Sequence, residues 1–84
     1  MISISELKQN ESGVITEINA QGKMKRRILD MGIVPGTEII LKRKAPLCDP
    51  LEFYVLGYRL SLRKSDAKLI SCERRTGRRI RKDL

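Results

Sequence analysis

The segment from Lys23 to Ile39 contains the only convincing helix signal in this chain, and the signal ends abruptly. Met24, Ile28 and Met31 are spaced at i, i+4 and i+7, which places them on one stripe of a helix. Gly32 follows at once and suits the left-handed position that closes many helices. The sequence therefore predicts a single short helix, about two turns long, from Met24 to Met31.

A turn and a strand, rather than a second helix, follow this stop. Pro35 and Gly36 fit a type II turn, because proline fixes one dihedral angle and glycine supplies the positive one. Residues 37–44 (TEIILKRK) then have strand character, with Ile39 and Leu41 on one face. A helix-turn-helix DNA-binding motif needs a second helix packed on the first. The sequence therefore argues against that class of DNA-binding protein.

The helix itself is strongly basic at its start. Lys25, Arg26 and Arg27 are expected on its flanks and back, where a solvated face is the more common role for such cations. Ile28 and Leu29 are separated by about 100° around the helix axis. We therefore expect one of these two side chains to face out of the core.

Most of the remaining chain consists of short strand-like segments. In residues 51–56, Leu51, Phe53 and Val55 are predicted to point inward. A tight hairpin is predicted at Gly57-Tyr58, with Tyr58 pointing inward on the return strand. In all, five segments have strand character, namely residues 14–19, 37–44, 51–56, 58–63 and 68–72. This order predicts a mainly β fold, a small five-stranded barrel with one short α-helix inserted after the first strand.

Length and charge divide the chain into a body and a tail. With 84 residues it is expected to form one domain, residues 1–72, followed by residues 73–84. No apolar run approaches the ~18 residues that span a bilayer, and the start has no signal-peptide pattern, so a cytoplasmic location is expected.

The tail holds half of the formal charge of +8, because its six cations outnumber its two acids by four. With Ile80 as its single large apolar residue before the end, it is expected to be flexible. It either keeps the protein in solution or contacts an anionic membrane surface or nucleic acid. Its cations are Arg74, Arg75, Arg78, Arg79, Arg81 and Lys82.

The residues that most catalytic and metal sites require are missing. The chain has no histidine, and its two cysteines, Cys48 and Cys72, lie 24 positions apart, so a tetrahedral metal site is not expected. Cys48 is next to Asp49, whose charge disfavours a reactive thiolate, and Cys72 ends an apolar run and is expected to be buried. The sequence predicts neither an enzyme nor a cofactor.

Three linked motifs make the sequence resemble the ferrous iron transport protein A (FeoA) family. They are RILDMGIVPGT at residues 27–37, APLCDP at residues 45–50 and GYRLSLRKSDA at residues 57–67. The resemblance covers about residues 3–72, and the basic tail from Glu73 is outside it. It implies an SH3-like barrel of the kind also found at the C-terminus of diphtheria-toxin-repressor-type metalloregulators.

The resemblance further implies a cytosolic accessory protein of ferrous iron uptake. Such a protein would bind and modulate the membrane transporter FeoB, which carries a cytoplasmic GTPase domain. Aromatic and arginine residues dominate interface energies, so the helix and the outward side of residues 51–56 are the expected contact surface. The candidate contact residues are Arg27, Ile28, Leu29, Asp30, Tyr54 and Leu56.

Other interpretations remain open at this stage. A basic barrel could bind nucleic acid, although the three aromatic residues are too few for a base-stacking platform. Direct iron binding is disfavoured by the missing histidines. Weak self-association through exposed strands is also consistent with a small barrel.

Overall fold

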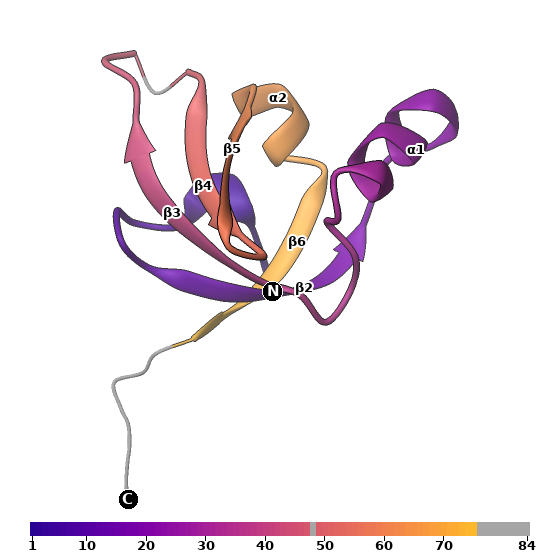
Figure 1. The fold of residues 1–84 in the computed structure, drawn as a ribbon, viewed down its shortest axis with the longest axis horizontal. Coiled ribbons are helices and arrows are strands. Elements are labelled where there is room, and N and C mark those ends of the chain that lie inside the picture. The colour runs from indigo at the N-terminus through magenta and orange to yellow at the C-terminus, as the bar shows by residue number, and fades with distance from the viewer. Residues whose placement is uncertain (48, 76–84) are drawn as a thin grey trace, which may run out of the picture.

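The fold is organised by one antiparallel sheet that wraps around a single core (Figure 1). A computed structural model describes residues 1–47 and 49–75. The sheet has six strands in the order β1-β6-β2-β3-β4-β5. The strands are β1 (Ile2–Ser3), β2 (Ser12–Ile18), β3 (Glu38–Lys44), β4 (Leu51–Val55), β5 (Tyr58–Leu62) and β6 (Ile70–Arg75).

Three helical segments connect the strands. A 3-10 turn, η1 (Ile4–Glu6), follows β1, and a short helix α2 (Lys64–Ala67) lies between β5 and β6. The helix α1 (Gly22–Asp30) is inserted between β2 and β3 and lies to one side of the barrel (Figure 1). The mainly β fold with one inserted helix is therefore confirmed.

The prediction of five strands missed one short strand. Strand β1 has two residues, and it pairs with β6 through Ile2 opposite Cys72. Two residues are too few to show the alternation on which strand prediction depends. Only the pairing with a distant segment makes β1 a strand.

The body also extends past its predicted boundary at residue 72. Strand β6 continues to Arg75, and Glu73 and Arg74 lie opposite Val14 and Gly13 of β2. The prediction of a flexible tail is therefore wrong for residues 73–75. These residues bury no apolar side chain, so their sequence contains no strand signal. Residues 76–84 lie outside the described residues.

The core forms mainly from alternate residues of the strands. Leu51, Phe53 and Val55 of β4 are buried as predicted, as is Cys72. Tyr58, predicted to point inward, is instead 42% exposed. It directly follows the hairpin turn, and its hydroxyl donates a hydrogen bond to a backbone carbonyl outside the sheet, that of Met31.

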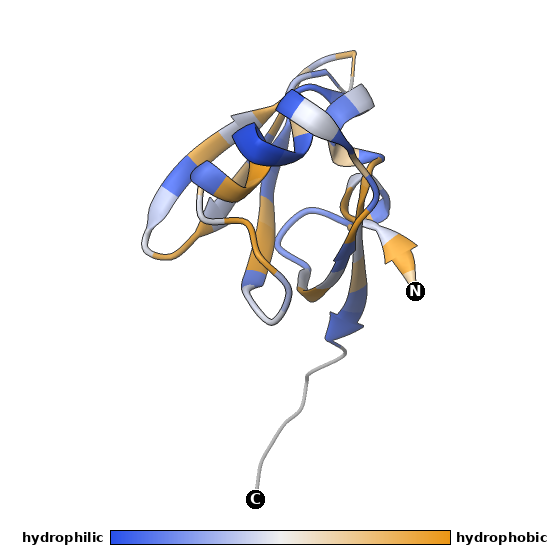
Figure 2. Cartoon of the chain, turned by 90° about the vertical axis from the view of Figure 1, so that its right-hand side faces the viewer, coloured by the Kyte–Doolittle hydropathy of each residue, from blue (hydrophilic) through white to orange (hydrophobic). Residues whose placement is uncertain are grey.

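The end of α1 follows local rules. Gly32 has a φ of +87° and Gly36 a φ of +95°, which confirms the left-handed cap and the positive angle expected of the turn. The amide of Thr37 donates to the carbonyl of Val34 at 3.1 Å and closes that turn. The helix stops at Asp30. Most of its exposed residues are hydrophilic, and the blue colour of the helix in Figure 2 reflects this composition.

Candidate docking surface

The tip of the β4–β5 hairpin has an unusual residue at its turn. Val55 pairs with Tyr58, so Leu56 and Gly57 form the two-residue turn, one position earlier than predicted. Their φ values of +52° and +85° match a type I′ turn, which normally carries Asn-Gly. A leucine in the left-handed region costs roughly 1–2 kcal/mol, yet Leu56 holds this position with 66% of its surface exposed.

The hairpin tip contacts the segment that follows α1. A Cβ atom placed on Gly32 would lie 2.8 Å from Cδ1 of Leu56, so the glycine makes room for the leucine. The Tyr58 hydroxyl donates to the carbonyl of Met31, one residue earlier. We call Met31, Gly32, Leu56 and Tyr58 the hairpin–helix junction. It brings together two segments that are more than twenty residues apart in the sequence.

The expected choice between Ile28 and Leu29 is decided by the fold. Ile28 is 0% exposed and belongs to the core, whereas Leu29 is 37% exposed. A completely buried side chain cannot contact a partner, so the prediction of Ile28 as a contact residue is wrong. Leu29 and its exposed neighbour Asp30 lie at the C-terminal end of α1, directly before the junction.

Tyr54 lies on another part of the surface. It alternates with the buried residues of β4 and is exposed on the outer side of the sheet, opposite Arg59. Arg59 in turn lies 3.8 Å from the carboxylate of Glu52. The structure therefore brings Leu56 to the helix end, and among the described residues no side-chain hydrogen bond or ion pair joins Tyr54 to that junction.

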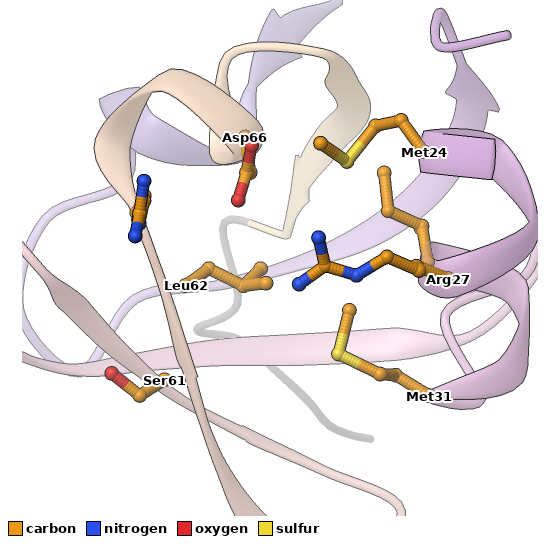
Figure 3. A pocket seen from close by; sticks show the side chains of 8 residues that line it. Met24, Arg27, Met31, Ser61, Leu62 and Asp66 are labelled. Carbon is orange, nitrogen blue, oxygen red and sulfur yellow. The ribbon is translucent and has the colours of Figure 1, made fainter.

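Arg27 lies on a flank of the helix, within the flanks and back predicted for its three basic residues. It follows Met24 by three residues and precedes Met31 by four, so its side chain lies beside theirs at the edge of their stripe. Its guanidinium points into a groove between α1 and the segment formed by β5 and α2 (Figure 3). The groove has a volume of about 160 Å³. We call it the α1–α2 groove.

The first cations of the predicted tail belong to the sheet. Arg74 forms an ion pair of 2.6 Å with Glu11, and Arg75 forms one of 3.3 Å with Glu38. Glu11 directly precedes β2 and Glu38 begins β3, so both arginines have acidic partners within the barrel. The remaining predicted tail cations, Arg78, Arg79, Arg81 and Lys82, lie outside the described residues.

The described residues offer little for catalysis or metal binding. Burial raises the pKa of the Cys72 thiol, although the nearby positive charge of Arg74 opposes that shift. Within residues 1–47 and 49–75, no three metal-ligating side chains come together. Over the same ranges, no helix has the length and apolar character needed to cross a bilayer.

Comparison with known families gives this surface a context. The FeoA domain family matches residues 2–74. The chain belongs to the FeoA family. This match covers the whole body of the barrel, including all six strands except the last residue of β6.

Solved structures of FeoA proteins share the fold. The chain is 44% identical to a FeoA-like protein from Clostridium acetobutylicum, with a TM-score of 0.81 over 87% of this chain and 85% of that one. It is 30% identical to Stenotrophomonas maltophilia FeoA, an SH3 domain protein crystallised with zinc, with a TM-score of 0.76 over 87% and 91% of the two chains. The SH3-like fold is therefore confirmed.

Metalloregulators share the fold alone. T. acidophilum IdeR is 17% identical, with a TM-score of 0.78 over 88% of this chain and 34% of its own. The resemblance to repressor domains is thus confirmed at the level of architecture.

One curated relative links the family to a transporter. It is a Fe(2+) transport protein A/Fe(2+) transporter FeoB fusion protein from Porphyromonas gingivalis, 39% identical over 70 residues. The match covers 83% of this chain but only 8% of the fusion protein. These matches connect the chain to ferrous iron transport.

Proposed function

We propose that this chain is a non-catalytic accessory protein that binds and modulates a FeoB-type ferrous iron transporter on its cytoplasmic side. The observation that carries the proposal is the fusion relative, in which FeoA and FeoB sequences share one polypeptide. Joining two domains raises their effective concentration toward each other and favours a weak contact. We propose that the FeoA barrel makes this contact through its own surface.

The hairpin–helix junction is the part of the surface best suited to that contact. Leu56 is exposed and strained at once, which favours neither stability nor solubility. Backbone strain in a bulky residue is often retained where function requires it. Leu29 and Asp30 adjoin the junction on α1, and Arg27 lies one turn earlier. We propose Leu56 and Leu29 as the apolar anchors of the interface and Tyr54 as a second contact region.

The non-catalytic part of the proposal rests on side-chain chemistry. The chain has no histidine to act as a general base. Cys72 is buried with a raised pKa, which opposes formation of the thiolate nucleophile. The tail beyond residue 75 would add electrostatic attraction to an anionic membrane surface close to the transporter.

The proposal is tested by titrating the chain against a FeoB-type transporter purified in detergent and against its isolated GTPase domain. Leu56→Asn should weaken binding by about tenfold or more, because it removes an exposed apolar anchor. The tail is removed after Arg75, since β6 extends that far. Binding that tolerates salt and survives this truncation supports docking through the barrel.

Leu47→Gln is the matched control. Leu47 is an even more exposed leucine, at 89%, and it precedes β4 whereas Leu56 follows it. It should bind like the unaltered chain. A chain that binds duplex DNA but not the transporter, with affinity lost in high salt, contradicts the proposal and favours the nucleic-acid alternative. Weak self-association stays a prediction, which sedimentation velocity checks.

A further inference from the structure

The α1–α2 groove combines apolar walls with positive charge. Met24 and Met31 form the apolar part of the α1 side, and Leu62 at the end of β5 lies opposite (Figure 3). Arg27 comes from the edge of the same helix stripe, and its guanidinium lies between the two methionine side chains in this view. An arginine at the edge of an apolar stripe is therefore directed over an apolar groove.

The charges that line the groove are not neutralised by one another. Arg63, the residue before α2, and Asp66 within α2 complete the ionisable lining with Arg27. Three ion pairs are present in the described part of the chain, and none includes these residues. Asp66 points toward the centre of the groove, as Arg27 does (Figure 3). The lining thus contains two arginines and one aspartate, which leaves an excess of positive charge.

We propose that the α1–α2 groove binds a short segment of a protein partner in which an aliphatic side chain is next to a carboxylate. The aliphatic group would pack between Met24, Met31 and Leu62. The carboxylate would pair with Arg27, whose planar guanidinium can donate two parallel hydrogen bonds to it. This inference rests on the proposed docking function and names the chemistry that the partner presents.

The size of the groove fits such a segment. Its volume of about 160 Å³ is close to the ~150 Å³ of an engineered protein cavity that accommodates benzene. One aliphatic side chain therefore fits, whereas a packed secondary-structure element does not. Methionine side chains are flexible and polarisable, so two of them can adjust to several aliphatic shapes.

The lining favours a peptide over a phosphate group. A lipid headgroup or a free phosphate would gain from the two arginines but would be repelled by Asp66. It would also leave the apolar wall of Met24, Met31 and Leu62 without a partner. A carboxylate carries a smaller charge, and the neighbouring aliphatic group covers that wall.

The test is an NMR titration of the whole chain with two blocked tetrapeptides, acetyl-Ala-Leu-Asp-Ala-amide and the same peptide with Asn in place of Asp. We expect the Asp peptide to shift the methyl signals of Met24 and Met31 and the Nε–H signal of Arg27. Its affinity should exceed that of the Asn peptide by about tenfold, as for a charge-assisted hydrogen bond.

Three variants separate binding from folding. Arg27→Gln should weaken the Asp peptide to the level of the Asn peptide, and Arg27→Lys should fall between them because it retains only the charge. Asp66→Asn should strengthen binding, since it removes the negative charge that repels the peptide carboxylate. A purely structural pairing of Arg27 with Asp66 would instead lower the midpoint of thermal unfolding in Arg27→Gln and Asp66→Asn and leave peptide binding unchanged.

Equal binding of the two peptides overturns the inference, as does a failure of both to shift the methionine signals. The groove would be a phosphate site instead if phosphatidylglycerol vesicles or inorganic phosphate shift the Nε–H signal of Arg27 and the Asp peptide does not. Transporter binding that is retained in Arg27→Gln contradicts this inference but leaves the proposed function standing. If the chain binds the Asp peptide but does not bind the transporter, the proposed function is contradicted and this inference is not.

Discussion

Two regions of this barrel differ in how well their sterically strained and charged residues are accommodated. Where β2 meets β6, the strands approach closely at Gly13, and the cations at the end of β6 are paired with acids. At the hairpin–helix junction, Leu56 is exposed in a left-handed conformation, and the nearby groove holds unpaired charges. The first region follows the rules of a stable sheet, and the second departs from them. Departures of this kind concentrate at functional sites.

Gly13→Ala should produce the largest loss of stability. A Cβ atom there would lie 2.8 Å from Sγ of buried Cys72 and 3.1 Å from the Glu73 carbonyl oxygen. Overpacking of this kind costs about 2 kcal/mol, and urea unfolding measures it. Adding Cys72→Ala should restore only part of the stability, because the backbone contact remains. An unchanged free energy of unfolding would show that β2 and β6 are less closely packed than described.

Gly32→Ala should cost somewhat less. The φ of +87° disfavours any side chain by about 1–2 kcal/mol. The new Cβ atom would also lie 2.8 Å from Cδ1 of Leu56, which belongs to a side chain able to move. The double variant with Leu56→Ala should therefore regain the contact part of the loss but not the backbone part. Equal stability of Gly32→Ala and the double variant would contradict the contact at the junction.

Leu56→Asn should raise stability, in contrast to the two glycine changes. Asparagine tolerates the left-handed region and is favoured before glycine in a type I′ turn, so a gain of about 1 kcal/mol is expected. Thermal unfolding measures it. The same variant should bind the transporter less tightly, which makes it a direct test of the contrast between the two regions. A variant that loses both stability and binding would show that Leu56 serves the fold.

Arg74→Gln should have the smallest effect. Its ion pair with Glu11 is 2.6 Å long, but the arginine side chain is well exposed, so solvent screens the interaction. We expect a loss below about 1 kcal/mol that shrinks in high salt. Unfolding in low and high salt provides the comparison. A larger loss that is insensitive to salt would indicate that Arg74 acts mainly through packing.

Local sequence patterns were sufficient to predict several structural elements of this protein. The alternation of Leu51, Phe53 and Val55 predicted the buried face of β4, because side chains of a strand point alternately to its two sides. The helix stop at Gly32 and the turn at Gly36 were predictable because their dihedral angles depend on the residue itself. The linked motifs identified the family, and with it the SH3-like fold.

Only the tertiary structure determined which side chains come together at the candidate site. Ile28 and Leu29 have similar side chains, and their burial depends on which side of α1 meets the barrel. The groove joins Arg27 to Arg63 and Asp66, which come from segments that no short-range pattern connects. Strand β1 and the last residues of β6 are extended because each pairs with a strand that is distant in the sequence. Sequence patterns thus determined what each segment prefers locally, and long-range packing determined which side chains meet.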